Sequence, residues 1–123
     1  MLFRSDISNY INWYEDKSLD DFIDFLSTAD LVCDQFGDSF QGMVTTLAFA
    51  LGKPVMGKFV KFKRFPIFPG LNVNTVDDVT KGLFFASNNR RQLEEIGKRS
   101  RLFAEKYMSS DYVAKQILKK LKD

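Results

Sequence analysis

The first half of the chain has a pattern of apolar and polar positions that predicts alternating strands and helices. Residues 7–13 have the apolar spacing of a short strand, and the apolar residues behind Ser18 recur at helical spacing, with Ser18 as the expected helix cap. Positions 31–33 form a short apolar run, which is typical of a buried parallel strand. A helix over residues 42–51 and a strand from Pro54 follow. The expected inward positions of that helix are Met43, Val44, Leu47, Ala48 and Leu51.

The second half of the chain predicts one more strand and then three helices. A short strand is expected over residues 71–73, and Thr75 is the expected cap of a helix that breaks at the asparagine pair 88–89. A long helix over residues 90–107 and a last helix beginning at the serine pair 109–110 complete the chain. The expected inward positions of these two helices are Leu93, Ile96, Leu102, Phe103, Val113, Ile117, Leu118 and Leu121.

This order of elements predicts an α/β fold with a doubly wound, Rossmann-like parallel sheet that ends in helices. Sheets of this kind bind ligands at the carboxyl ends of their strands. The candidate site is therefore the loop after the first buried strand, together with the N-terminus of the following helix. Free N–H groups of residues 42–45 suit an anion such as a phosphate. The local pattern alone favours a plainer alternative, a strand-to-helix turn in which Ser39 caps the helix.

Composition changes this picture mainly by exclusion. The 123 residues include one cysteine and no histidine, which rules out an internal disulfide, a histidine base and the usual zinc sites. No apolar run reaches the length of a membrane span, so we expect a cytoplasmic protein whose membrane contact, if any, is peripheral. Residues 1–50 hold two basic and nine acidic residues, whereas residues 51–123 hold sixteen basic and seven acidic ones. This asymmetry indicates either ordinary solvated charge or contact with an anion or acidic lipid.

Three further features have both a functional and a structural interpretation. Lysine and phenylalanine interleave in residues 58–68, a pattern found at nucleic-acid and anionic membrane surfaces. We favour a surface loop or edge strand there and expect no nucleic-acid partner. The lysines of the last helix are interpreted as a solvated face near a helix C-terminus. Cys33, in the expected buried strand, is interpreted as a small core residue.

A family resemblance gives the candidate site a more specific meaning. Residues 29–56 read ADLVCDQFGDSFQGMVTTLAFALGKPVM. This segment resembles the donor-binding domain of retaining GT-B glycosyltransferases of the group 1, family 4 type. In that family a strand leads through a Gly-containing loop to a helix reading roughly Glu-Ala-Met-Ala-Leu-Gly-Lys-Pro-Val. The residues in register are Asp30, Asp34, Gln35, Gly42, Ala48, Ala50, Leu51, Gly52, Lys53, Pro54 and Val55, and residues 93–118 resemble the closing helices of the family.

The resemblance implies transfer of a sugar from a nucleotide-sugar donor to an acceptor, such as a saccharide or a lipid-linked glycan. It implies no cofactor and no metal held by protein side chains, and it identifies no catalytic residue. The positions that match the family's donor-diphosphate site are Ser39, Phe40, Gln41, Gly42, Met43 and Val44. Further contacts to the donor sugar or ribose fall at Asp38, Thr46 and Leu47.

Two positions depart from the family pattern. The family places glutamates eight residues apart, where this chain has Ser39 and Leu47. The second glutamate binds the ribose hydroxyls, and losing such a hydrogen bond costs roughly 1.5–3 kcal/mol, or about ten- to a hundredfold in affinity. Core packing is the favoured interpretation of Leu47. The alternative to an enzyme is therefore a non-catalytic, glycosyltransferase-like module that serves as a partner or scaffold. An unrelated receiver-like domain is a weaker third hypothesis.

The resemblance also predicts how the chain is organised. Residues 1–5 read MLFRS, and one back-translation of them matches the end of a common sequencing adapter, so we expect a non-native leader there. Residues 6–123 are expected to form part of a Rossmann-like nucleotide-sugar-binding domain. The first strands of that domain and the whole N-terminal acceptor domain have no counterpart in this sequence. We therefore expect the chain alone to be inactive as an enzyme.

Overall fold

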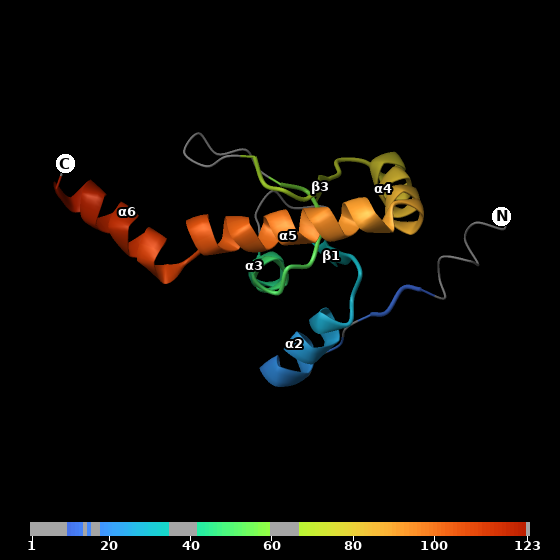
Figure 1. Cartoon of the computed structure of the whole chain (residues 1–123), viewed down its shortest axis with the longest axis horizontal. Coiled ribbons are helices and arrows are strands. Elements are labelled where there is room, and N and C mark those ends of the chain that lie inside the picture. Colours follow the sequence, from blue (N-terminus) through green and yellow to red (C-terminus); the bar gives the residue numbers. More distant parts are fainter. Residues whose placement is uncertain (1–9, 14, 16–17, 35–41, 60–66, 123) are drawn as a thin grey trace.

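The computed structural model describes residues 10–13, 15, 18–34, 42–59 and 67–122. In these ranges the chain forms a mixed α/β structure with five helices and one three-stranded parallel sheet (Figure 1). The strands β1 (Val32–Asp34), β2 (Val55–Gly57) and β3 (Leu71–Asn72) lie side by side in that order. The helices are α2 (Leu19–Ser27), α3 (Met43–Ala50), α4 (Val76–Asn88), α5 (Arg90–Tyr107) and α6 (Ser110–Lys122).

The predicted α/β class and the parallel pairing of the strands are confirmed. Val32 lies opposite Val55 between β1 and β2, and Met56 lies opposite Leu71 between β2 and β3. Val55 and Met56 are both fully buried, so the central strand is covered on both faces. Since successive side chains of a strand point to opposite faces, Val55 joins the core beside α3 and Met56 lies beneath α4.

Local capping sets the helix boundaries where the sequence predicts them. The Ser18 hydroxyl accepts the backbone N–H of Asp21 and begins α2. Thr75 and Asp78 form a capping box at the start of α4, in which Asp78 also accepts the N–H of Asn74. These backbone hydrogen bonds, that of Asn74 foremost, lower the pKa of Asp78. The end of α4 at the asparagine pair and the bounds of α5 are confirmed as predicted.

The aromatic residues form the centre of the core. The ring of Phe49, which is fully buried, lies 6.4 Å from that of Phe59, 6.5 Å from that of Phe68 and 6.0 Å from that of Phe103. Phe103 in turn lies 5.0 Å from the ring of Tyr107. This cluster holds α3, α5 and the chain between β2 and β3 together. Residues 60–66 of the predicted basic and aromatic loop lie outside the described residues.

Helix α5 crosses closely over the turn between α3 and β2. Gly52 has a φ of 72°, the left-handed conformation of a residue that closes a helix, which confirms its predicted role after α3. A Cβ atom at Gly97 of α5 would overlap the carbonyl oxygen of Gly52. The Arg101 guanidinium donates a hydrogen bond to the carbonyl oxygen of Ala50, near the end of α3. Glycine at position 97 is therefore what lets α5 approach this turn.

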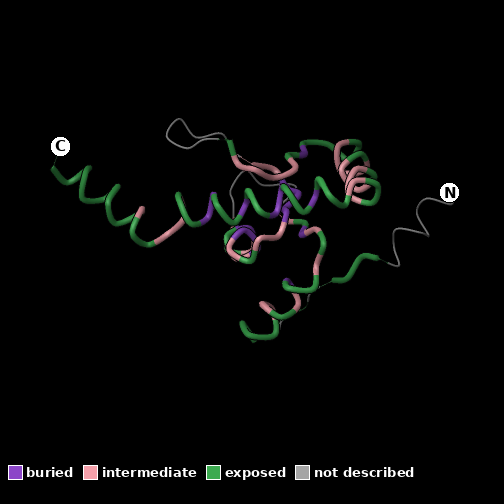
Figure 2. Tube along the Cα trace, in the orientation of Figure 1, coloured by how far each residue is buried: buried purple, intermediate pink, exposed green. Residues whose placement is uncertain are grey.

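Several predicted inward positions are wrong. Met43 and Leu102 are exposed by 74% and 64%, and Leu51 is also at the surface. No other described element covers these side chains. Helix α6 points away from the body, and its apolar residues stay exposed (Figures 1 and 2). The strand predicted over 7–13 is wrong where the structure describes it, since Tyr10 to Trp13 have no strand structure and both aromatic side chains are 85% exposed.

Cys33 is also exposed, which corrects its predicted place in the core. It lies on the same face of the sheet as Met56, its partner in β2, but β1 is the outer strand among those described. Although Cys33 reaches the surface, neighbouring atoms remove much of the water around its thiol. This desolvation raises its pKa from an ordinary 9.0 to about 11, so the thiol is neutral at physiological pH.

Among the described helices, none has the length and apolar character needed to cross a bilayer.

Candidate functional site

The carboxyl ends of the three parallel strands meet at one edge of the sheet, as their shared direction requires. Strand β1 ends there at Asp34, and α3 begins behind it at Met43. Gly42, the N-cap of α3, has an extended backbone and provides no side-chain cap. The exposure of Met43 places the first turn of α3 in contact with solvent. Among the described residues no side chain caps this turn, so its N–H groups and the positive end of the helix dipole lie at the carboxyl edge of the sheet.

A hydrogen bond across the site fixes α3 to the sheet. The Thr45 hydroxyl donates to Oδ2 of Asp34 over 2.8 Å, and Thr45 is 2% exposed. Eleven residues separate the two partners along the chain, so this bond joins the end of β1 to the helix behind it. Thr45 is not among the predicted site residues. The signal that could have identified it is its spacing from Ala48 and Phe49, the two fully buried residues of α3.

The structure brings together part of the predicted donor site. Gly42, Met43 and Val44 form the open first turn of α3, with Met43 exposed and Val44 half-buried. The Thr46 hydroxyl is exposed and lies 3.4 Å from the carbonyl oxygen of Gly42, to which it donates. Leu47 is half-buried and packs against the core, which agrees with the packing interpretation of this position. The other predicted contacts, Asp38, Ser39, Phe40 and Gln41, lie outside the described residues.

Among the described residues, few charged side chains lie around this turn. The first turn of α3 contains no acidic residue, and the carboxylate of Asp34 is engaged by Thr45. Within the described residues, no cluster of three or more cysteine, aspartate or glutamate side chains is suited to hold a metal ion. An anion at the start of α3 would therefore be held by backbone N–H groups and the helix dipole.

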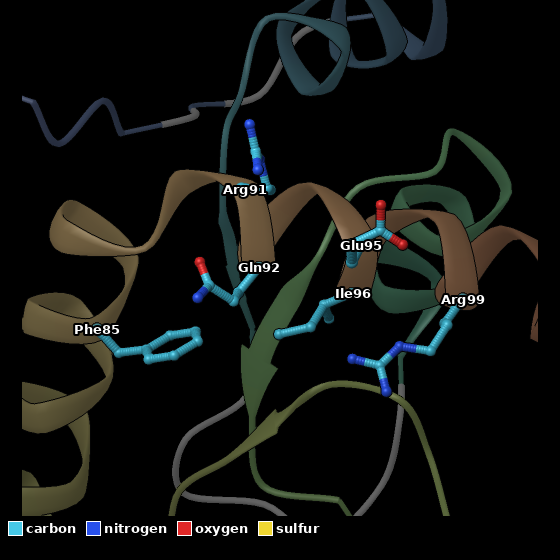
Figure 3. A pocket seen from close by; sticks show the side chains of 6 residues that line it. All are labelled: Phe85, Arg91, Gln92, Glu95, Ile96 and Arg99. Carbon is cyan, nitrogen blue, oxygen red and sulfur yellow. The ribbon is translucent and has the colours of Figure 1, made fainter.

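Two hollows lie elsewhere on the surface and contain none of the predicted site residues. The larger, of about 370 Å³, lies between α4 and α5, where Phe85 points toward Ile96 and Arg91 points away from them (Figure 3). The other lies near the start of α5 and carries charges of both signs, including an ion pair of 3.2 Å between Arg90 and Asp30. Neither hollow is lined by the described residues of the first turn of α3, where the donor site is predicted.

The bond between Asp34 and Thr45 can be tested by its effect on stability. Asp34→Ala is expected to lower the free energy of unfolding by about 1–3 kcal/mol, because a buried hydroxyl loses its acceptor. Asp34→Asn keeps an oxygen at this place and should cost less than about 1 kcal/mol. Urea unfolding followed by circular dichroism measures both. Asp30→Ala, at an exposed ion pair, is the matched control and should cost at most about 1 kcal/mol. Equal losses for Asp34→Ala and Asp30→Ala would contradict an anchoring role for Asp34.

Comparisons with known proteins add no further assignment. No family model matches the sequence, and no curated protein or solved structure matches it at a significant level.

Proposed function

We propose that this chain is the donor-binding part of a GT-B glycosyltransferase, with a doubly wound sheet that holds a nucleotide sugar at its carboxyl edge. The observation that carries the proposal is the open first turn of α3 beside the end of β1. Gly42, Met43 and Val44, which match the family's donor-diphosphate positions, lie in this turn. The parallel pairing of β1 with β2 further supports it, because ligands of such sheets bind beyond the carboxyl ends of the strands.

In the proposed mechanism this turn stabilises the leaving group. Transfer of the sugar breaks the bond between its anomeric carbon and the diphosphate and forms a bond to an acceptor hydroxyl oxygen. Negative charge develops on the departing diphosphate oxygen, which accepts the proton that the acceptor hydroxyl loses. N–H groups fixed at the start of α3 stabilise that charge without a metal ion. The hydrogen bond from Thr45 to Asp34 would hold the helix in place while the charge develops. A saccharide or lipid-linked glycan would be the acceptor, bound by a separate N-terminal domain.

The direct test is a titration of the isotope-labelled chain with uridine, guanosine and adenosine diphosphate sugars, followed by NMR. Donor binding should shift the amide signals of residues 42–46 more than those of α6, which lies away from this edge. A second titration with the matching nucleoside monophosphates separates recognition of the diphosphate from recognition of the base. Absence of any shift at residues 42–46 with all three donors would contradict the proposal.

Leu47→Glu is expected to strengthen donor binding by about ten- to a hundredfold. The substitution restores the carboxylate that matches the family's ribose contact, and a charge-assisted hydrogen bond of this kind is worth roughly 1.5–3 kcal/mol. Calorimetric titration with the donor that gives the largest NMR shift measures the change. Leu51→Glu is the matched control, because it makes the same change at an exposed position at the other end of α3, outside the predicted site, and should not tighten binding.

A second candidate function is supported by the packing of Leu47 against the core. A module that kept the fold and lost donor binding would use position 47 for packing and serve as a partner or scaffold. Leu47→Glu would then only destabilise the chain, since a carboxylate would replace a half-buried apolar side chain. Thermal unfolding of Leu47→Glu and of the control Leu51→Glu, measured with and without donor, distinguishes the two functions: donor should stabilise the Leu47→Glu variant only if the enzyme proposal holds.

A further inference from the structure

Helix α6 carries an apolar face that the rest of the described chain leaves uncovered. It projects from the end of α5 and none of its residues is buried (Figures 1 and 2). Four apolar side chains, here called the α6 stripe, are exposed by 47–77%: Val113, Ile117, Leu118 and Leu121. At 100° per residue they fall within roughly 140° of the helix circumference, the width of a packing face.

The attachment of α6 to the body uses its opposite side. Tyr112 makes an edge-to-face contact with Tyr107 of α5, with ring centroids 5.5 Å apart. Tyr112 lies roughly 170° around the helix from the middle of the α6 stripe. The contact that positions α6 therefore turns the stripe away from α5, and Ser109, which accepts the N–H of Tyr112, fixes the start of the helix in this orientation.

The charges beside the α6 stripe indicate what covers it. Four lysines of α6 are exposed and a single acid, Asp111, lies in its first turn. The lysines beside the stripe are Lys120 and Lys122, roughly 90° and 110° from its middle, and Lys115, roughly 130° from it; Lys119 lies on the opposite side of the helix. Pairing of two copies through this stripe would bring two such lysine groups together and be opposed by their repulsion. A negatively charged surface is complementary to them.

We propose that α6 is an interfacial helix that binds the surface of an anionic lipid bilayer. The α6 stripe enters the boundary between headgroups and acyl chains, and the lysines contact lipid phosphates. The helix of 13 residues is about 20 Å long and lies in the plane of the membrane. This inference is independent of the proposed donor site, because it uses neither α3 nor any nucleotide.

Co-sedimentation of the full chain with lipid vesicles tests the proposal. The chain should bind vesicles of phosphatidylcholine with 30% phosphatidylglycerol, bind pure phosphatidylcholine vesicles at least tenfold more weakly, and lose anionic binding as salt rises. Equal binding to the two vesicle types, or binding to neither, would overturn the proposal. A failed donor titration would leave this result unaffected, so the two proposals can fail separately.

Variants of the α6 stripe locate the contact. Leu121→Glu and Ile117→Glu should each weaken binding to anionic vesicles on the order of a hundredfold, since each removes apolar burial and adds repulsion. Leu102→Glu makes the same change at an exposed position of α5 and should change binding far less. Circular dichroism should show all three folded as the parent chain, because each position is exposed. Equal effects of Leu121→Glu and Leu102→Glu would overturn the assignment to α6.

The lysines are tested in the same way. The double substitution Lys120→Gln and Lys122→Gln, at the two edges of the stripe, should weaken binding roughly tenfold or more, from about fivefold per lysine near an anionic surface. Lys81→Gln with Lys98→Gln removes equal charge from the exposed faces of α4 and α5 and is the control. Sedimentation velocity without lipid tests whether the stripe instead binds a second copy of the chain. Self-association that Leu121→Glu abolishes would identify the stripe as a protein interface and overturn the membrane proposal.

Discussion

Phe49→Ala should lower the free energy of unfolding by about 3–5 kcal/mol, the largest effect expected of any single substitution described for this chain. The ring of Phe49 is fully buried and lies within 6.5 Å of the rings of Phe59, Phe68 and Phe103. Truncation removes its apolar contacts and leaves a cavity that these three rings cannot fill without losing their own contacts. A loss of this size is a large part of the 5–15 kcal/mol that typically stabilises a domain.

Urea unfolding, followed by circular dichroism and by tyrosine fluorescence, measures the loss at Phe49. Leu102→Ala is the matched control, because Leu102 is an apolar residue of the neighbouring α5 that is 64% exposed. It should change the free energy of unfolding by no more than about 0.5 kcal/mol. A loss below about 1 kcal/mol for Phe49→Ala would contradict the central place of this ring in the core.

Met56→Ala is expected to cost about 2–5 kcal/mol, because Met56 is fully buried in the central strand beneath α4. The contact between Met56 and Gly82 of α4 allows a second test, in which both residues are substituted. A Cβ atom at Gly82 of α4 would overlap Sδ of Met56, so these two residues share one space. Gly82→Ala alone therefore combines a gain in helix propensity of about 1 kcal/mol with an overpacking cost of about 1–3 kcal/mol.

The double variant separates these effects. With Met56→Ala in place, the methyl group of Gly82→Ala occupies space that the methionine side chain has left, and its helix propensity is gained without the overlap. The two substitutions together should thus be less destabilising than the sum of their separate costs by about 0.5–3 kcal/mol. Met43→Ala, at the exposed methionine of α3, is the control and should be nearly neutral. Additive costs would show that α4 does not pack on Met56 as described.

The packing of the core also positions the candidate site. Phe49 and Thr45 are buried residues of the same helix, one packed on the aromatic cluster and the other bonded to Asp34 at the end of β1. Together they fix both the position and the rotation of α3. The direction in which the N–H groups of its first turn point is therefore a consequence of core packing. We expect Phe49→Ala to weaken any donor binding as well as stability.

Position 47 has one role in the family pattern and another in the packing of this chain. The resemblance places a ribose-binding carboxylate at this position, whereas the structure has an apolar side chain that is half-buried against the core. The energy of one charge-assisted hydrogen bond, roughly 1.5–3 kcal/mol, is similar to that of burying a leucine side chain, about 1.5–3 kcal/mol. The donor affinity and the stability of Leu47→Glu must therefore be measured together.

Much of the secondary structure could be predicted because its signals are local. The Ser18 cap, the capping box of Thr75 with Asp78 and the closing Gly52 each depend on residues within a few positions of one another. The bounds of α5 follow from the asparagine pair before it and from its own apolar spacing. Such signals act through backbone hydrogen bonds and conformation, and they do not require knowledge of the neighbours in space.

The candidate site was predictable only in part for the opposite reason. The position of the open α3 turn follows from the strand-to-helix order, and Gly42, Met43 and Val44 lie in it. The bond that orients this turn joins Asp34 to Thr45 across eleven residues; the spacing of Thr45 from Ala48 and Phe49 can indicate burial, but it does not identify Asp34 as the partner. Burial distinguishes Thr45 from Thr46, because one side of α3 faces β1 and the other faces solvent.

The sequence by itself determined the α/β class, the order of the elements from residue 19 onward and the ends of several helices, since these depend on periodicity and on caps formed within a single turn. Only the tertiary structure decided which apolar faces are covered. Leu102 and the α6 stripe have the spacing of buried positions and are exposed, and Cys33 is exposed in the outer strand among those described. Periodicity shows that a helix or strand has an apolar face, but burial requires another element in contact with that face, and contacts between distant segments depend on how the whole chain packs.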